Sequence, residues 1–232
     1  MYEGNDQHYY AVGRSASINI TQALLARLNY GGDAAPVERV LDFGSGYGRV
    51  ARYLRAMFPA AAIDVTELDA RAVEWCIREF GCEDMGADLP AGAYDLIWAG
   101  SVFTHLPEDS AIELLSKMKA GLKPNGLMVL TTIGRYALSN LETFALQHKL
   151  ENEFLSYNLT PAAAAKICSE YRATGFGYCD YPHQQGYGIA LIGFDWFIRK
   201  FVDDEIVQVM AQERAWDIHQ DVVAFMRRPL SR

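Results

Sequence analysis

The sequence predicts an α/β protein with a doubly wound, mainly parallel sheet that carries helices on both faces. Two observations predict this class. Apolar segments of strand length alternate with segments of helical period between residues 37 and 133. Short turns rich in glycine and proline join them. Sheets of this kind bind ligands at the carboxyl ends of their strands.

The composition limits the kind of protein this is. The 232 residues suffice for one domain, and a chain that is 50% apolar and 12% aromatic is folded rather than disordered. The net charge of −8 argues against a nucleic-acid partner. No apolar run reaches the ~18–20 residues of a membrane span, and the first residues show no secretory pattern. A soluble, cytoplasmic protein without a membrane partner is therefore expected.

The cysteines predict no metal site. No two of them form a C-x-x-C pair, so neither a zinc site nor a redox dithiol is indicated. Buried, reduced thiols are expected at all four positions: Cys76, Cys82, Cys168 and Cys179.

An amphipathic helix is expected before the main fold. Apolar residues recur at helical spacing over residues 17–28. A cluster of Asn, Gly, Asp and Pro residues then ends the helix between residues 29 and 36. Residues 1–36 are therefore interpreted as an N-terminal helical segment.

Residues 37–133 contain the predicted sheet. Strands are expected at residues 37–43, 61–67, 94–99 and 127–133. Three helices lie between them, because the apolar residues of each intervening segment fall on one helical face. They are expected from residue 49 to the break at Pro59, and at residues 70–80 and 108–122.

The alternation stops after residue 133. Residues 135–159 are mixed helical and polar, which predicts a cap or insertion at this point. A helix with Thr160 as its N-cap follows at residues 161–171. The remaining elements are a short helix at residues 195–201 and strands at residues 176–181, 188–193, 206–211 and 221–226.

A glycine loop between the first strand and its helix is the strongest functional signal. Asp42 ends the strand, and Gly44, Gly46 and Gly48 follow at alternate positions. A dinucleotide fingerprint requires its third glycine at position 49, which is Arg49. A carboxylate at the strand end repels phosphate and attracts a cation. The loop therefore favours a ligand that carries an ammonium and a sulfonium group.

The loop resembles the first motif of the class I S-adenosylmethionine-dependent methyltransferases, an acid followed by G-x-G-x-G. The resemblance implies that Asp42, the three glycines and Ser45 hold the amino-acid half of S-adenosylmethionine. Glu67 follows the next strand, where the family's acid accepts hydrogen bonds from the ribose hydroxyls; Leu68 is its neighbour in this site. Asp69 is the alternative acid, or simply a helix N-cap.

Two later segments extend the resemblance over about residues 37–133. Residues 86–90 resemble the adenine-contacting segment, which assigns Asp88 to the adenine, with a surface turn as the alternative. Residues 98–107 resemble the fourth motif, whose backbone, here Gly100 and Ser101, would run beneath the methyl donor. Four matches in order are a far more specific signal than one glycine loop.

The resemblance also implies the rest of the architecture. The family's sheet has seven strands, of which the final one, here residues 221–226, is antiparallel. The N-terminal segment, residues 1–36, would fold over the site as a lid. Within one structural domain, residues 37–133 would bind the cofactor. Residues 134–232 would supply an insertion after the fifth strand, the strands that complete the sheet, and the acceptor site.

Methyl transfer needs a base only when the acceptor must lose a proton, and histidine suits this role near neutral pH. His105, beyond a strand end, and His219, before the last strand, are the candidates; a packing role is the alternative for His105. No metal is expected. The residues expected to contact the acceptor come from the N-terminal segment, an aromatic and amide-rich loop, and the approach to the last strand: Tyr10, Arg14, His183, Tyr187 and Gln220.

The leading hypothesis is a methyltransferase acting on a small molecule, at oxygen, with a sugar or natural-product hydroxyl as the acceptor and S-adenosylhomocysteine as the product. The alternative from another class is a regulatory or interaction module that binds S-adenosylmethionine without turnover. A nicotinamide oxidoreductase is a third interpretation, disfavoured by Asp42 and by the glycine spacing. A homodimer is left open.

Overall fold

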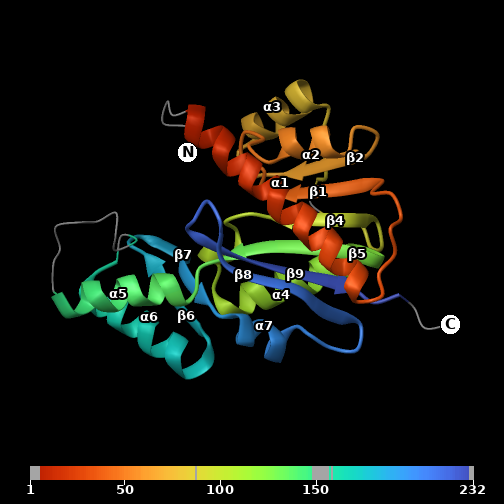
Figure 1. Ribbon diagram of the computed structural model, residues 1–232. Helices are drawn as coiled ribbons and strands as arrows, with labels where there is room; N and C mark the ends of the chain where they lie inside the picture. Colours follow the sequence, from red (N-terminus) through yellow and green to blue (C-terminus); the bar gives the residue numbers. More distant parts are fainter. Residues whose placement is uncertain (1–5, 87, 148–156, 158, 230–232) are drawn as a thin grey trace.

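The computed structural model describes residues 6–86, 88–147, 157 and 159–229 (Figure 1). Its main sheet has seven strands in the order β3-β2-β1-β4-β5-β9-β8. Neighbouring strands of this sheet pair in parallel, except that β9 is antiparallel to both β5 and β8. The strands are β1 (Arg39–Phe43), β2 (Ala62–Thr66), β3 (Glu83–Asp84), β4 (Tyr94–Ala99), β5 (Leu122–Thr132), β8 (Ile206–Trp216) and β9 (Gln220–Arg227).

Helices cover both faces of this sheet. On one face α1 (Asp6–Asn29), α2 (Ala51–Met57) and α3 (Ala70–Phe80) share an apolar core with the strands. On the other face a second core includes α4 (Glu108–Gly121) and α7 (Phe194–Lys200). Neighbours such as Val40 and Leu41 in β1 enter opposite cores and are both fully buried, which explains why the strand is apolar without alternation. The predicted doubly wound fold with an antiparallel last strand is confirmed.

The segment between β5 and α7 forms a third cluster. Helix α6 (Pro161–Thr174) packs on a separate two-stranded sheet of β6 (Phe176–Tyr181) and β7 (Gln184–Ile192), and α5 (Arg135–Gln147) packs on α6. The strands predicted at residues 176–181 and 188–193 are present, and among the described residues they form a two-stranded sheet apart from the main sheet. The two later strands, β8 and β9, do complete it.

Helix α1 and strand β3 also differ from the sequence prediction. Helix α1 extends over 24 residues and not only residues 17–28, because its first turns pack on α2 and on the glycine loop. Strand β3 was not predicted, because its two residues, Glu83 and Asp84, are exposed acids with no apolar pattern. It pairs with β2 at the edge of the sheet.

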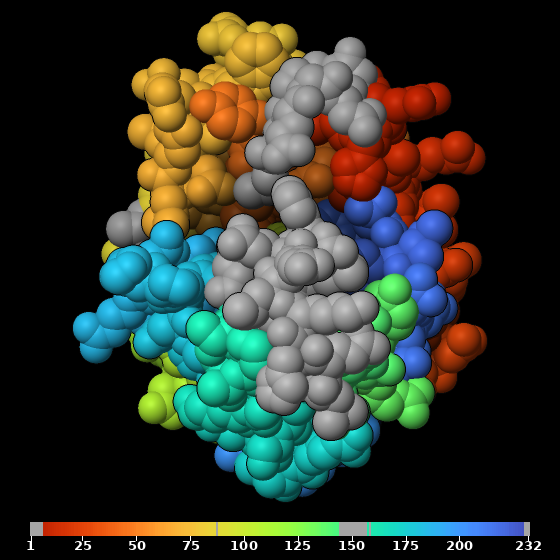
Figure 2. Space-filling model, turned by 90° about the vertical axis from the view of Figure 1, so that its left-hand side faces the viewer, coloured from red at the N-terminus to blue at the C-terminus, as the bar shows by residue number. Residues whose placement is uncertain are grey.

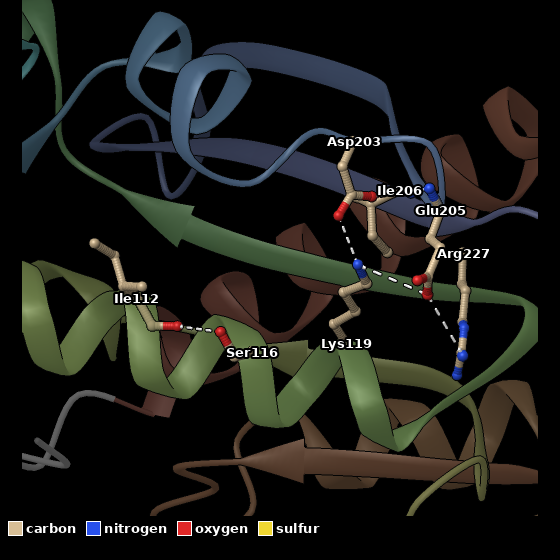
Figure 3. Close-up of polar contacts among 7 residues, drawn as sticks. All are labelled: Ile112, Ser116, Lys119, Asp203, Glu205, Ile206 and Arg227. Carbon is tan, nitrogen blue, oxygen red and sulfur yellow. Dashed lines mark hydrogen bonds and ion pairs between the residues drawn. The ribbon is translucent and has the colours of Figure 1, made fainter.

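An ion-pair cluster joins α4 to the start of β8 (Figure 3). The Nζ atom of Lys119 lies 2.6 Å from a carboxylate oxygen of Asp203 and 3.7 Å from one of Glu205. The same oxygen of Glu205 lies 3.6 Å from Arg227 in β9. Asp203 also accepts hydrogen bonds from the backbone N–H groups of Glu205 and Ile206. These contacts define where the edge strand β8 begins.

The parallel strands β1, β4 and β5 end at one edge of the sheet, on the side of the molecule that is turned toward the viewer in Figure 2. Helices α1 and α3 border this edge above, and the β6–β7 hairpin and α6 border it at the side and below. The antiparallel β9 begins at the same edge, since Asp221 pairs with Thr132. Among the residues that the structure describes, no helix has the length and apolar character to cross a membrane.

Candidate functional site

The glycine loop needs its glycines for two different reasons. Gly44, Gly46 and Gly48 all have positive φ, at +75°, +52° and +76°. A Cβ at Gly48 would lie 2.3 Å from the ring of Phe80, so this position also requires close packing. At Gly46 nothing lies within 4 Å of such a Cβ, so the loop is open there and a ligand can approach its backbone.

Asp42 lies beneath this loop with an unsatisfied oxygen. Its side chain is 1% exposed, and its Oδ2 atom has no hydrogen-bond partner among the described residues. Burial raises the pKa of Asp42 to about 7. A hydrogen bond from the backbone of Ala51 and the charge of Arg49 lower this pKa, but their effect is smaller than that of burial. A buried acceptor of this kind is stabilised by a cationic or hydrogen-bond-donating ligand.

Arg49 is a site residue that the sequence reasoning did not assign. It follows the last glycine of the loop, its guanidinium lies 5.9 Å from the ring of Trp216, and burial lowers its pKa. Its charge also interacts with Asp42. The signal in the sequence was the basic residue at the start of the helix, which was used only to reject a dinucleotide fingerprint.

Glu67 lies against the glycine loop. One of its carboxylate oxygens accepts the N–H of Gly46 at 2.9 Å, and the other accepts the N–H of Leu68 at 2.7 Å. The side chain of Leu68 is fully exposed. The structure thus brings the acid after β2 together with the loop after β1, as the order of the parallel strands requires.

Asp69 and Asp88 take no part in the contact between Glu67 and the glycine loop. Asp69 caps α3 by accepting the N–H of Arg71, so the N-cap interpretation is confirmed for it. Asp88 is an exposed residue in the connection between β3 and β4. The residue before it, in the same predicted adenine segment, lies outside the described residues.

Gly100 and Ser101 follow β4, and other side chains pack tightly around Gly100. A Cβ at Gly100 would lie 2.8 Å from Trp98 and 3.0 Å from Trp216. Ser101 has φ +60°, and its backbone N–H donates to the hydroxyl of Thr131 at 2.7 Å. The amide of Gln220 in turn donates to the hydroxyl of Ser101 at 3.0 Å. The structure therefore joins one residue predicted to contact cofactor with one predicted to contact acceptor.

His105 is held by the β6–β7 hairpin, 83 residues further along the chain. Its Nδ1 atom lies 2.8 Å from the carbonyl oxygen of Gly188. A carbonyl only accepts, so Nδ1 carries the hydrogen and the lone pair is on Nε2. The imidazole stacks on Tyr187 with centroids 5.0 Å apart, and Tyr181 lies at 6.0 Å. Burial lowers the pKa of His105, which keeps the ring neutral near pH 7.

His219 lies elsewhere, in the turn between β8 and β9. Its ring centroid lies 6.1 Å from that of Tyr157, and partial burial of the imidazole lowers its pKa. The predicted contact of the β9 amino end with the carboxyl ends of the parallel strands is present. Among the described residues, the structure shows no contact of His219 with His105, Tyr181 or Tyr187.

Three predicted acceptor contacts are not brought together with His105 or Ser101. Tyr10 packs on α2, with the guanidinium of Arg52 4.6 Å from its ring centroid. Arg14 lines a groove of about 390 Å³ between α1 and the edge strand β8. His183 is exposed at the tip of the β6–β7 hairpin. The ring of Tyr181, which was not singled out as an acceptor contact, is closer to His105 than any of these.

The strand order, the glycine loop after β1 and the acid after β2 define a Rossmann-like fold of the class I methyltransferase type. The chain belongs to the methyltransferase-domain family, whose model matches residues 13–178. It is accordingly a member of the class I S-adenosylmethionine-dependent methyltransferases.

Relatives with different acceptors match the chain to a similar degree. It is 32% identical over 124 residues to N-terminal Xaa-Pro-Lys N-methyltransferase 1 of Mus musculus, covering 49% of this chain and 56% of that protein. It is 32% identical over 107 residues to malonyl-[acyl-carrier protein] O-methyltransferase of Halalkalibacterium halodurans, covering 41% and 39%. The chain thus spans about half or less of the length of these relatives.

Solved structures share the fold. PKMT2 from Rickettsia typhi in complex with AdoHcy has a TM-score of 0.58 at 13% identity, over 90% of this chain and 53% of that one. A putative S-adenosylmethionine-dependent methyltransferase from Listeria monocytogenes has a TM-score of 0.56 at 12% identity, over 90% and 99%. At these identities the likeness shows the fold alone.

The residues present fit S-adenosylmethionine. The methionine end of the cofactor carries an ammonium and a carboxylate, and the site holds the unsatisfied oxygen of Asp42 close to the cationic Arg49. The open position at Gly46 leaves room for the ligand beside Glu67. In the part of the chain that is described, no group of three or more His, Cys, Asp or Glu side chains is placed to hold a metal ion.

Proposed function

We propose that this chain transfers the methyl group of S-adenosylmethionine to a hydroxyl oxygen of a small-molecule acceptor. The observation that carries the proposal is His105, a neutral imidazole whose Nδ1 hydrogen is bound to Gly188 and whose Nε2 lone pair is left to accept a proton. Hydroxyl acceptors need such a base, since their oxygen is a weak nucleophile until its proton leaves.

The proposal gives the cofactor-binding residues separate roles. Asp42 and Arg49 bind the ammonium and the carboxylate of the methionine end, with the glycine loop and Ser45 around it. The carboxylate of Glu67 exchanges its hydrogen bond with Gly46 for the ribose hydroxyls. Leu68 and Asp88 flank the ribose and the adenine, and Gly100 with Ser101 lies beneath the methyl donor. When bound, the cofactor supplies an electrophilic methyl group and leaves as S-adenosylhomocysteine.

The acceptor is placed beside His105. Its hydroxyl proton goes to Nε2, while the aromatic rings of Tyr181 and Tyr187 exclude water from the imidazole and present apolar faces to a sugar or an aromatic ring. His219 is a second candidate base, at the β8–β9 turn. Residues 37–133 would then bind the cofactor, and residues 134–232, with the lid in residues 1–36, would build the acceptor site.

A second candidate is methyl transfer to an amine. It is favoured by the similarity to N-terminal Xaa-Pro-Lys N-methyltransferase 1 and, at 26% identity, to glycine/sarcosine/dimethylglycine N-methyltransferase of Actinopolyspora halophila. His105 would serve there by removing the proton of an ammonium acceptor. A non-catalytic module that binds the cofactor remains the alternative from another class.

Release of S-adenosylhomocysteine from the full chain tests the proposal. The acceptor panel contains sugars, phenols, glycine and a peptide that begins with Xaa-Pro-Lys. Turnover with hydroxyl acceptors that is lost in His105→Ala supports the proposal. Turnover with amines alone overturns the oxygen assignment, and tight cofactor binding without turnover on the panel or on small-molecule extracts supports the module. We expect no nucleic-acid substrate, a cytoplasmic location, and either a monomer or a homodimer.

A further inference from the structure

A closed ring of hydrogen bonds joins the ends of three strands at the edge that carries the site. The N–H of Ser101 donates to the hydroxyl of Thr131 at 2.7 Å. That hydroxyl donates to the Oε1 atom of Gln220 at 2.6 Å, and the Nε2 atom of Gln220 donates to the hydroxyl of Ser101 at 3.0 Å. The three residues follow β4, lie within β5 and begin β9.

Ser101 needs this support because of its backbone. Its φ of +60° lies in the left-handed region, which residues with a Cβ rarely adopt. The ring satisfies both its N–H and its hydroxyl in that conformation. Local strain of this kind persists only where the surroundings determine it, and it concentrates at functional sites.

The peptide before Ser101 is confined from the other side. A Cβ at Gly100 would approach Trp98 to 2.8 Å and Trp216 to 3.0 Å. Trp216 is buried, and its indole N–H donates to the carbonyl of Val12 in α1 at 3.0 Å. The two tryptophan rings also meet edge to face at 5.6 Å. The segment after β4 is therefore held by the ring on one side and by the tryptophans on the other.

We infer that Gln220 is a positioning residue: through Thr131 and Ser101 it holds the backbone after β4 in the conformation that receives the methyl donor. This inference rests on the proposed function. It differs from the sequence prediction that Gln220 contacts the acceptor, because both the oxygen and the nitrogen of its amide are already bonded within the ring. A ring closed by three bonds loses its constraint when any one member is removed.

The test measures the affinity for S-adenosylhomocysteine by titration calorimetry, with a thermal melt of every variant. Gln220→Leu and Thr131→Val should each bind about tenfold more weakly than the unaltered chain, and the double variant no more weakly than either one, because both break the same ring. Gln220→Glu keeps an acceptor for Thr131 and offers a second oxygen to the hydroxyl of Ser101, so it should bind several-fold more tightly than Gln220→Leu.

Gln212→Leu is the matched control, because Gln212 is an exposed glutamine of the neighbouring strand β8 that takes no part in the ring. It should leave the affinity unchanged. If Gln220→Leu does not fold, the comparison of Thr131→Val with Thr131→Ser, which keeps the hydroxyl, carries the test. Ring variants that bind like the unaltered chain, or strictly additive losses, overturn the inference while the proposed function stands. If the unaltered chain does not bind S-adenosylhomocysteine, both fail.

Discussion

The Nδ1 atom of His105 lies 2.8 Å from the carbonyl oxygen of Gly188, which joins the segment after β4 to the β6–β7 hairpin. The contact fixes both the tautomer and the orientation of the imidazole. Gly188 is required there because a Cβ would lie 2.0 Å from the carbonyl oxygen of Cys179 in the paired strand. The β6–β7 hairpin, which lies outside the parallel sheet, therefore orients the proposed base.

The first prediction concerns that base. His105→Ala should lower kcat by about 10²–10⁴-fold and leave the affinity for S-adenosylhomocysteine within about twofold, because the imidazole acts on the acceptor and not on the cofactor. His219→Ala, measured in parallel, shows whether the other histidine contributes. Equal turnover of unaltered chain and His105→Ala would remove His105 from the mechanism.

The pH profile gives an independent check. Burial lowers the pKa of His105 below its usual 6.5, and only the neutral ring accepts a proton. We expect kcat to be constant between about pH 7 and 8 and to fall in more acidic solution, as the imidazole becomes protonated. A kcat that still rises tenfold between pH 7 and 8 would assign the proton transfer to a different group.

Asp42 should contribute to function at the expense of stability. Burial raises its pKa from 3.8 to about 7, so the folded chain keeps a proton that the unfolded chain loses. The stability contributed by this group is complete below about pH 4 and is lost as the pH rises to about 7. Asp42→Asn should therefore raise the free energy of unfolding at pH 8 by roughly 1–4 kcal/mol. Chemical denaturation at pH 4 and pH 8 measures this difference.

The same variant should bind S-adenosylhomocysteine more weakly, by about 1–3 kcal/mol, because a charged acceptor for the ammonium is lost. A variant that is less stable at pH 8, or that binds as well as the unaltered chain, would contradict the role given to Asp42.

Glu67 and Asp69 form a matched pair of acids two positions apart. Glu67→Ala should weaken binding of S-adenosylhomocysteine by about 1–3 kcal/mol through the lost bonds to the ribose. Asp69→Ala should instead remove the N-cap of α3, which lowers the stability of the fold and leaves the affinity unchanged. Calorimetry and thermal melts of both variants separate the two effects. The reverse pattern would make Asp69 the ribose ligand.

Two glycines of the loop should likewise separate an effect on stability, at Gly48, from an effect on cofactor binding, at Gly46. Gly48→Ala should cost about 2–4 kcal/mol of stability, because it combines a positive φ with a Cβ that would lie 2.3 Å from Phe80. Gly46→Ala should cost only about 1–2 kcal/mol, for its φ alone, yet abolish measurable cofactor binding by filling the open side of the loop. Retained binding in folded Gly46→Ala would show that the ligand does not approach there.

The features that the sequence could predict are those encoded locally. The period of apolar residues predicted α2, α3 and α4, and the alternate glycines after Asp42 predicted the loop. Strand β3 could not be found, because two exposed acids carry no apolar pattern. The pairing of the two hairpin strands with each other was not predicted, since strand periodicity does not specify a partner.

The contacts that organise the site are non-local, and for that reason the sequence did not reveal them. Gln220 bonds Ser101 across 119 positions and Thr131 across 89, and neither spacing leaves a pattern. Arg49 was visible as a basic residue after the loop, and only the structure shows it half-buried, with its charge interacting with that of Asp42.

A crystal structure of the full chain with S-adenosylhomocysteine tests the central claim most directly. The account predicts the methionine end between Asp42 and Arg49, the ribose hydroxyls about 3 Å from the carboxylate of Glu67, and the sulfur facing Nε2 of His105. A nucleoside bound away from the glycine loop, or a sulfur separated from His105 by other side chains, would contradict it.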